Sequence, residues 1–199
     1  MALEVMIGKK SKVVRFSPVF KTEPAKLLAA VRKQGLEGII AKEPGSIYEP
    51  DRRSGAWLKA KVFGEQELVI GGFTPPQNSR PYFGAILVGY YDGKKLMYAG
   101  KVGTGFDRAQ LASLHKEFLR RRSAECPFAN LPQARKPRYG LGMTAAAMRE
   151  VTWVKPQLVA QVRFAEWTSE GSLRQPVFLG LRQDKRASEV VREAGAVEK

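Results

Sequence analysis

Three closely spaced segments decide the fold: ELVIGGFT at residues 67–74, FGAILVGYY at residues 83–91 and KLMYAGKV at residues 95–102. Each is an apolar run of strand length that ends close to turn-forming residues. Asp92-Gly93, between the second and third segments, is a strong signal for a tight hairpin. The segments therefore predict three consecutive β-strands, the last two of which form a hairpin.

The segment that follows, residues 106–122, has the apolar spacing of an amphipathic helix, with Asp107 as its N-cap. Its apolar side is predicted to consist of Leu111, Leu114, Phe118 and Leu119. Residues 123–149 are rich in Pro, Arg and Ala, and they predict a long loop.

Two further strands are predicted at residues 158–168 and 173–182. Three strands, a helix and two or more strands is the order found in a small Greek-key barrel of the oligonucleotide-binding (OB) type. Aromatic residues lie on these strands among arginines and lysines, where they either stack on bases or fill the barrel. Strand alternation favours the core for Phe73, Tyr82, Phe83, Tyr90, Tyr91, Trp153, Phe164 and Trp167.

The chain before the barrel predicts an incomplete unit with a helix and short strands. Residues 13–20 predict a strand, and residues 24–35 predict a helix of about three turns that ends at a glycine. Residues 38–41, Gly-Ile-Ile-Ala, have the pattern of a strand buried on both faces. The overall class is therefore mainly β with some α (α+β).

The segment WLKAKV at residues 57–62 alternates, which places Lys59 and Lys61 on the same face of a strand. After this strand, the sequence changes to closely spaced apolar runs of strand length. We predict a domain boundary there, with one partial domain over residues 1–62 and a barrel domain over residues 63–199.

The composition describes a folded, strongly basic protein. Among 199 residues, 34 are Lys or Arg and 19 are Asp or Glu, which gives a formal charge of +15, and 44% are hydrophobic. An excess of positive charge of this size favours an anionic partner, namely nucleic acid, acidic lipid or nucleotide phosphate. The alternative is that the charge is only solvated surface charge. The apolar runs are too short to span a bilayer and the start does not resemble a signal peptide, so we expect neither membrane insertion nor export.

The chain has one cysteine, Cys126, and one histidine, His115. One cysteine and one histidine are too few for a disulfide framework or a zinc cluster. They also exclude a Ser-His-Asp or Cys-His catalytic set in which a further cysteine or histidine is left over. We expect a lightly buried thiol and an imidazole on a helix surface. Any chemistry here must therefore use lysine, arginine and carboxylates.

One set of residues fits that requirement. Glu37 lies at the head of a predicted strand, and the next strand carries Lys59 and Lys61 on one face. A carboxylate and two lysines in this arrangement can hold a divalent cation and a phosphate between them, and cancel charge that develops during phosphoryl transfer. The alternative is an exposed edge strand whose lysines prevent pairing with another chain.

The same residues resemble a known family. EGIIAK at 37–42 followed by WLKAK at 57–61 is similar to motifs IV and V of the covalent nucleotidyltransferases, which include ATP-dependent DNA ligases, RNA ligases and capping enzymes. Further segments, in order, resemble the ligase module of bacterial DNA ligase D, an end-joining ligase. They are GSIYEPDRRSGAWLKAK, ELVIGGFTPPQNSRPYFGAILVGYY, YAGKVGTGF, FAEWTSEG and FLGLRQDK.

The resemblance implies a role for several residues. Glu37 becomes a metal-site carboxylate, and Lys59 and Lys61 contact the α-phosphate of ATP or of the adenylate, with Mg²⁺ or Mn²⁺ as the metal. The segment LRQDK at 181–185 resembles motif VI, and its charged residues would orient the leaving pyrophosphate. These residues are Arg182, Asp184 and Lys185. The alternative for this segment is the charged start of a C-terminal helix.

DNA contacts are predicted at three basic residues. Arg52 and Arg53 lie in the turn-rich stretch between the two N-terminal strands, and Lys101 lies in the glycine-rich turn AGKVGTGF. That turn is neither a P-loop nor a GxGxxG motif, so its alternative is a purely structural turn.

The nucleophile of the family is missing from this sequence. These ligases attack ATP with the lysine of a Lys-x-Asp-Gly motif. The single Asp-Gly in this sequence is Asp92-Gly93, and the residue two positions before the aspartate is Tyr90 and not a lysine. We therefore expect the last part of a nucleotidyltransferase domain and a whole OB domain that cannot self-adenylate.

The resemblance implies the C-terminal part of an ATP-dependent DNA ligase that acts on nicked or broken double-stranded DNA through enzyme–AMP and DNA–adenylate intermediates. It also implies a bacterial cytoplasmic, nucleoid-associated location and end-joining partner proteins. Two alternatives remain: a stand-alone DNA-binding OB module, and one subunit of a split ligase whose lysine lies on a separate nucleotidyltransferase segment.

Overall fold

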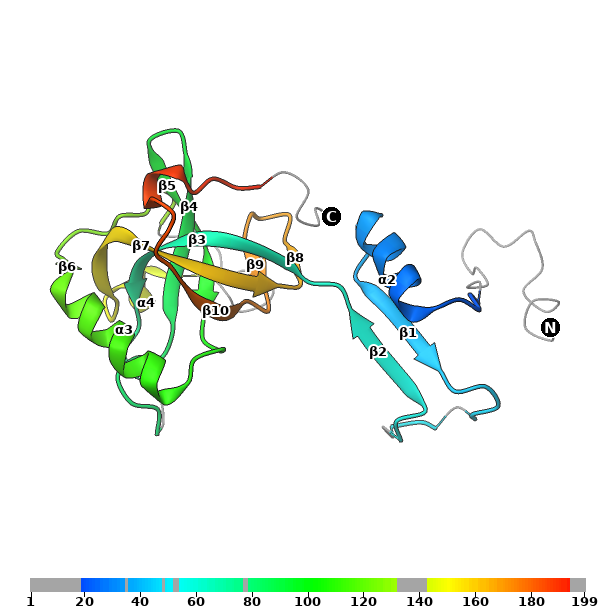
Figure 1. Ribbon diagram of the computed structural model, residues 1–199. Helices are drawn as coiled ribbons and strands as arrows, with labels where there is room; N and C mark the ends of the chain where they lie inside the picture. Colours follow the sequence, from blue (N-terminus) through cyan, green and yellow to red (C-terminus); the bar gives the residue numbers. More distant parts are fainter. Residues whose placement is uncertain are drawn as a thin grey trace.

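The computed structural model describes residues 19–34, 36–47, 49–51, 54–76, 79–131 and 143–193. Figure 1 shows two units joined by a short extended segment, a helix with a small sheet and a larger curved sheet with a helix beside it. The small unit contains α2 (Pro24–Lys33), β1 (Gly38–Lys42) and β2 (Trp57–Lys61). The large unit contains β3 (Gly64–Phe73), β4 (Ile86–Asp92), β5 (Lys95–Val102), α3 (Arg108–Arg120), β6 (Arg122–Ser123), α4 (Ala145–Met148), β7 (Thr152–Phe164), β8 (Glu166–Trp167), β9 (Leu173–Arg174), β10 (Val177–Arg182) and the 3₁₀ helix η1 (Ala187–Glu189). The expected class, mainly β with some α, is confirmed.

The large sheet is antiparallel and closes on itself. Its strand order is β10-β7-β3-β4-β5, and β6 also pairs with β7. Just after the end of β5, the carbonyl of Thr104 accepts a hydrogen bond of 2.9 Å from the backbone N–H of Phe178 on β10, and Thr104 and Val177 form an isolated parallel bridge. This bridge brings the two edges of the sheet together and closes it into a barrel.

The predicted strands that decide the fold are present. β3, β4 and β5 follow one another in sequence and in space, and β4 and β5 form the expected hairpin. Gly93 opens its two-residue turn with φ +58°, a conformation that favours glycine.

The loop predicted over residues 123–149 includes Ser123 of β6 and the four-residue helix α4, and the rest of its described residues are irregular; residues 132–142 lie outside the described residues. The start predicted for the next strand was wrong, because β7 begins at Thr152, well before residue 158. The strand runs through Pro156, a residue without an N–H that is unusual in a central strand. The β3–β7 register jumps from Leu158 to Trp153, so Pro156 falls where this pairing is interrupted.

The barrel interior is apolar and aromatic. Phe73, Phe83, Phe164 and Trp167 are at most 5% exposed, which confirms the core role predicted for these four. Trp153 is 9% exposed and belongs to a second buried apolar cluster. Tyr90 and Tyr91 are half-buried and pack against these clusters, whereas Tyr82 is 42% exposed, so its predicted core role was wrong.

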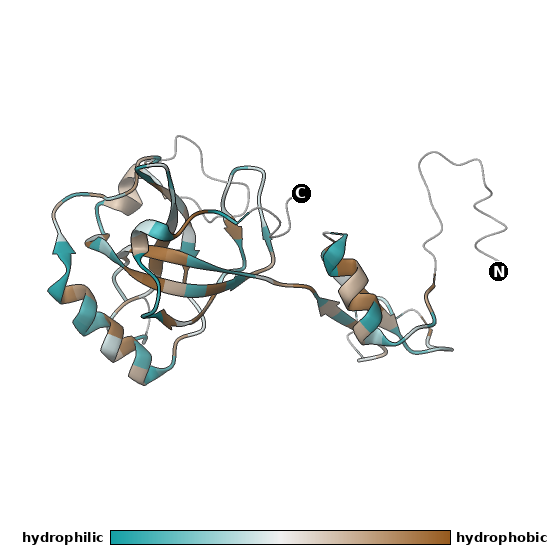
Figure 2. Cartoon of the chain, turned by 45° about the horizontal axis from the view of Figure 1, so that its top comes forward, coloured by the Kyte–Doolittle hydropathy of each residue, from teal (hydrophilic) through white to brown (hydrophobic). Residues whose placement is uncertain are grey.

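Helix α3 covers one end of this core. Asp107 is its N-cap, and it forms a reciprocal capping box with Gln110, as expected for the start of a helix. Figure 2 shows α2 and α3 banded in hydrophilic and hydrophobic colours. Leu119 is 47% exposed, so its predicted place on the apolar side was wrong. It follows the buried Phe118 directly, and one residue turns the side chain about 100° round the helix.

The small unit is a two-stranded sheet with α2 against it. Residues 13–18 of the strand predicted at 13–20 lie outside the described residues. β1 was predicted to be buried on both faces, but Ile40 is 57% exposed. Within the described part of the chain no third strand joins β1 and β2, so this sheet has little cover.

Candidate functional site

The antiparallel register of β1 and β2 brings Glu37, Lys59 and Lys61 together. Gly38 pairs with Lys61 and Ile40 pairs with Lys59, which places both lysines beside the start of β1. The Lys59 Nζ donates to Glu37 Oε1 at 2.8 Å, and the Lys61 Nζ lies 3.7 Å from the same oxygen. The predicted grouping of these three residues is therefore present.

The electrostatics of this cluster favour an ionised carboxylate. The hydrogen bond from Lys59 lowers the pKa of Glu37; burial opposes this, and the charges of Lys59, Lys61 and Arg174 lower the pKa further. The Glu37 side chain is 38% exposed and that of Lys59 is 52% exposed. Such an exposed ion pair contributes little to folding, so its partners are free to exchange for a phosphate or a cation.

This cluster suits a metal held jointly with phosphate oxygens. Among the residues that the structure describes, no group of three or more His, Cys, Asp or Glu side chains forms a metal cage. Glu37 alone is a hard oxygen ligand, and Mg²⁺ is commonly bound by one or two carboxylates together with substrate phosphates and water. The donor set therefore fits a metal that arrives with a nucleotide.

The Glu37 titration gives a direct check of this geometry. A lowered pKa means that the fold favours the ionised form, so any stabilisation from Glu37 is present above its unfolded pKa and is lost as the pH falls through its folded pKa. We expect a ¹³C NMR titration to place the Glu37 pKa below the ordinary glutamate value, and Lys59→Ala to raise it. The control Lys26→Ala, an exposed lysine on α2, should leave it unchanged; an unchanged value in Lys59→Ala would contradict the assignment.

Lys61 has a second partner that the sequence did not predict. Its Nζ donates to Gln175 Oε1 at 2.9 Å, across the junction between the two units. Gln175 lies between β9 and β10 with φ +51°. A glutamine in a turn carries no sequence signal for such a contact.

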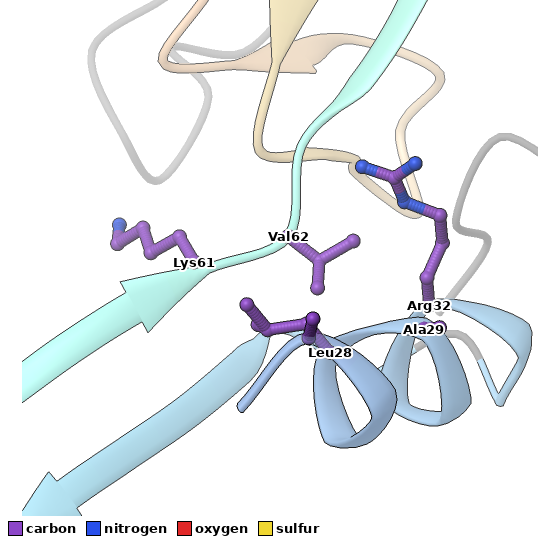
Figure 3. Close-up of a pocket in the computed structure, with 6 residues that line it drawn as sticks. Leu28, Ala29, Arg32, Lys61 and Val62 are labelled. Carbon is purple, nitrogen blue, oxygen red and sulfur yellow. The ribbon is translucent and has the colours of Figure 1, made fainter. Parts of the chain in front are cut away.

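A hollow of about 290 Å³ lies next to this cluster, between α2 and the end of β2 (Figure 3). Its lining is mostly apolar and consists of Ala25, Leu28, Ala29, Arg32, Lys61 and Val62. The Lys61 side chain extends away from Arg32 and reaches Gln175 instead. The hollow is a packing gap beside the cluster and has no set of converging polar groups.

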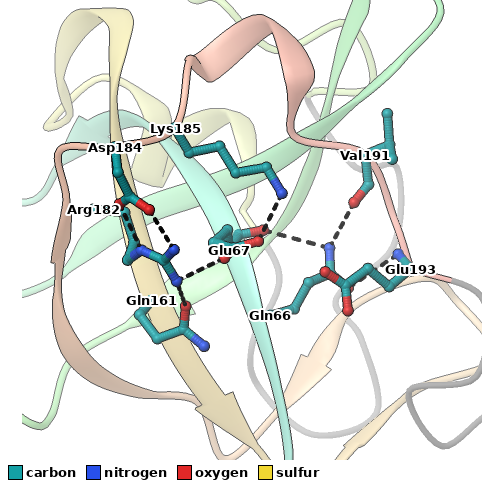
Figure 4. Close-up of polar contacts among 8 residues, drawn as sticks. All are labelled: Gln66, Glu67, Gln161, Arg182, Asp184, Lys185, Val191 and Glu193. Atoms are coloured by element: carbon teal, nitrogen blue, oxygen red, sulfur yellow. Dashed lines mark hydrogen bonds and ion pairs between the residues drawn. The ribbon is translucent and has the colours of Figure 1, made fainter.

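The segment predicted to resemble motif VI forms a second polar cluster (Figure 4). Arg182 Nε and Nη2 donate to the two carboxylate oxygens of Asp184 at 2.9 and 2.7 Å. This bidentate pairing lowers the pKa of Asp184 to about 2 and raises that of Arg182. The alternative of a C-terminal helix beginning here was wrong, because Arg182 ends β10 and Asp184 and Lys185 lie in the turn before η1.

Glu67 is the residue of this cluster that sequence reasoning missed. It was assigned only as the first residue of a strand, yet its carboxylate binds both Arg182 and Lys185. No hydrogen bond or ion pair connects this second cluster to Glu37, Lys59 or Lys61 within the described ranges.

Of the three residues predicted to contact DNA, the structure describes only Lys101. Arg52 and Arg53 lie outside the described residues, and Lys101 is half-buried on β5. The turn after Lys101 has a structural reason for its glycines. Gly105 has φ +93°, and a Cβ there would lie 2.1 Å from the carbonyl oxygen of Phe178, so this turn must be glycine where β5 meets β10.

The single cysteine is half-buried, as expected, and the single histidine lies half-buried on α3. Burial raises the pKa of the Cys126 thiol, which disfavours a reactive thiolate. His115 packs edge-on against Phe73, with ring centroids 5.8 Å apart.

Comparison with known proteins supplies the family. The model for the C-terminal region of ATP-dependent DNA ligases matches residues 79–185, and the model for the ATP-dependent DNA ligase domain matches residues 2–61. The chain belongs to the ATP-dependent DNA ligase family. The expected resemblance is thereby confirmed.

Relatives of this ligase chain include end-joining ligases. The multifunctional non-homologous end joining protein LigD of Pseudomonas aeruginosa is 40% identical over 198 residues, which is 98% of this chain and 22% of the relative. The DNA ligase of Thermococcus fumicolans is 30% identical over 165 residues, or 78% of this chain and 26% of the relative.

A solved structure agrees in fold. The crystal structure of the ligase domain from M. tuberculosis LigD is 41% identical, with a TM-score of 0.57 over 85% of this chain and 52% of that domain. The ligase chain thus spans about half of a solved ligase domain and about a fifth of the LigD relative. None of its described helices is long and apolar enough to cross a membrane.

Proposed function

We propose that this chain is the C-terminal part of an ATP-dependent DNA ligase that seals breaks in double-stranded DNA through enzyme–AMP and DNA–adenylate intermediates. The contact of Glu37 with Lys59 and Lys61 carries the proposal, since it joins two lysines and a carboxylate that suit nucleotide phosphate chemistry. The sequence has a single Asp-Gly, with Tyr90 in the lysine's place. The nucleophilic lysine therefore comes from a segment outside these 199 residues, on the same polypeptide or on a separate one.

The proposed roles follow from charge. Lys59 and Lys61 contact the α-phosphate and offset the negative charge that builds up as it is transferred. Glu37 would hold a divalent metal, Mg²⁺ or Mn²⁺, which when bound would supply positive charge for the phosphate chemistry.

The second cluster acts on the leaving group. Arg182 and Lys185 contribute positive charge near the β- and γ-phosphates of ATP during adenylation of the lysine, and Asp184 holds the guanidinium in a fixed orientation. The two clusters meet only if the barrel moves toward the small unit. Release of the Lys61–Gln175 hydrogen bond accompanies that movement.

DNA is bound mainly through its backbone. The formal charge of +15 favours phosphate contacts, to which we assign Lys101, Arg52 and Arg53. The LigD relative is named as an end-joining protein, so we propose that the partners are end-joining proteins and that the ligase works at the nucleoid in the bacterial cytoplasm.

The test is sealing by a completed enzyme. The chain is joined to the part of the Pseudomonas LigD ligase region that precedes its matched segment, and nicked duplex DNA, ATP and Mg²⁺ are added. We expect the joined protein to seal nicks and the 199-residue chain alone to seal none. Sealing by the chain alone, or failure of a folded joined protein to seal, would contradict the proposal.

A stand-alone DNA-binding module is the second candidate, because a basic barrel binds DNA without ligase chemistry. It predicts an affinity for DNA that falls steeply with salt and survives Lys59→Glu and Lys61→Glu. The ligase proposal predicts that these two substitutions abolish sealing while affinity changes little.

A further inference from the structure

Glu67 is shared between the two cations of the second cluster. Its Oε1 accepts a hydrogen bond from Arg182 Nη1 and its Oε2 accepts one from Lys185 Nζ, each at 2.8 Å (Figure 4). The Glu67 side chain is only 14% exposed, whereas those of Arg182 and Lys185 are 37% and 31% exposed. A mostly buried carboxylate therefore holds two cations that project toward solvent.

Strand pairing explains this contact between distant parts of the sequence. β3 and β10 both pair with β7, and Gln161 on β7 lies opposite both Glu67 and Gly180. Gln161 Oε1 accepts a further hydrogen bond from Arg182 Nη1 at 3.3 Å. The position of the Arg182 guanidinium is thus set by the body of the sheet.

The two cations differ in what remains available to a ligand. The Nε, Nη1 and Nη2 atoms of Arg182 all donate to protein oxygens. The Lys185 ammonium has three N–H groups and makes one hydrogen bond among the described residues. Lys185 therefore keeps two donors for an anionic oxygen, whereas Arg182 is almost fully engaged.

The neighbouring Gln66 fixes the chain on the other side of Lys185. Gln66 is 1% exposed, its Nε2 donates to the carbonyl of Val191 at 2.9 Å, and its Oε1 accepts from the N–H of Glu193 at 3.3 Å. Two adjacent residues of β3 thus secure both the 182–185 segment and the tail that follows it.

We infer that Glu67 is a positioning residue: it locks Arg182 into the framework of the barrel and presents the Lys185 ammonium to the phosphates of ATP. The identity of the anion rests on the proposed function. The contact also raises the pKa of Lys185, so the ammonium stays charged at the pH of the reaction. A purely structural Glu67 would instead stabilise the barrel and affect every activity of the protein equally.

The first test uses the chain itself. Nζ–H NMR signals of lysine are recorded for the wild type, Glu67→Gln and the control Glu65→Gln, with Lys185→Arg to assign the signal. Glu65 is an exposed carboxylate two residues away on the same strand. We expect the Lys185 protons to exchange with solvent at least about tenfold faster in Glu67→Gln only; unchanged exchange would overturn the inference.

The second test uses the chain joined to a lysine-bearing segment and separates two steps. We expect Glu67→Gln to slow enzyme–AMP formation at least about tenfold, while sealing of a pre-adenylated nick stays within about threefold of wild type. If both steps fall together with the unfolding temperature, Glu67 is structural and the inference is wrong. If the wild-type joined protein forms no enzyme–AMP, the proposed function fails, and the proton exchange of Lys185 still decides the role of Glu67.

Discussion

Replacing Lys61 by alanine in the chain joined to a lysine-bearing segment is expected to lower the rate of enzyme–AMP formation about 100-fold or more. Removing one preorganised donor from a developing negative charge costs about 10²–10³ in rate in well-studied enzymes. The Lys61 Nζ lies 3.7 Å from Glu37 Oε1 and its side chain is only 25% exposed, so alanine at this position removes a half-buried cation from beside the carboxylate. We expect the same order of loss for Lys59→Ala, measured as the initial rate of AMP incorporation from labelled ATP.

The matched control is Lys26→Ala, which removes one exposed lysine from α2 in the same unit. It should leave the rate within about twofold of wild type, because a single exposed charge on a helix surface is largely screened by solvent and salt. Equal losses in Lys26→Ala and Lys61→Ala would show that general charge matters and not this position, which would contradict the site.

The largest effect on stability is expected at Phe118. This ring is fully buried, and its centroid lies 5.2 Å from that of Phe73 and 5.3 Å from that of Phe83, so it attaches α3 to the barrel core. Phe118→Ala removes the ring and leaves a cavity. We expect it to lower the free energy of unfolding by about 3–5 kcal/mol, measured by urea denaturation followed by circular dichroism.

Leu119→Ala is the control for this prediction, because Leu119 is the next residue on the same helix and is 47% exposed. Its free energy of unfolding should stay within about 0.5 kcal/mol of wild type. A loss below about 1 kcal/mol for Phe118→Ala would show that α3 does not depend on this contact.

The sequence predicted those parts of the fold and site that depend on local pattern. The apolar runs of β3, β4 and β5, the hairpin at Gly93 and the Asp107 cap are all set by neighbouring residues. Lys59 and Lys61 share a face because strand periodicity requires it. Their grouping with Glu37 was predicted from its place at the head of the preceding strand, and the β1–β2 register provides it.

The features that the sequence did not predict depend on contacts between distant residues. Glu67 meets Lys185 across 118 positions, and Lys61 meets Gln175 across 114 positions. These pairings exist only once β7 lies between β3 and β10, and no spacing within a segment encodes them. Ile40 was misplaced for a similar reason, because the burial of a strand depends on the elements that cover it.

The central claim is that this chain supplies the groups that handle phosphate but not the nucleophile, and the direct measurement is where AMP becomes attached. The 199-residue chain is mixed with a separately purified lysine-bearing segment of the Pseudomonas LigD ligase region, ATP and Mg²⁺, and the intact mass of each polypeptide is recorded. We predict a mass increase of one AMP on the added segment, dependent on the presence of this chain, and none on the chain itself. An AMP adduct on a lysine of this chain, with or without the added segment, would contradict the account.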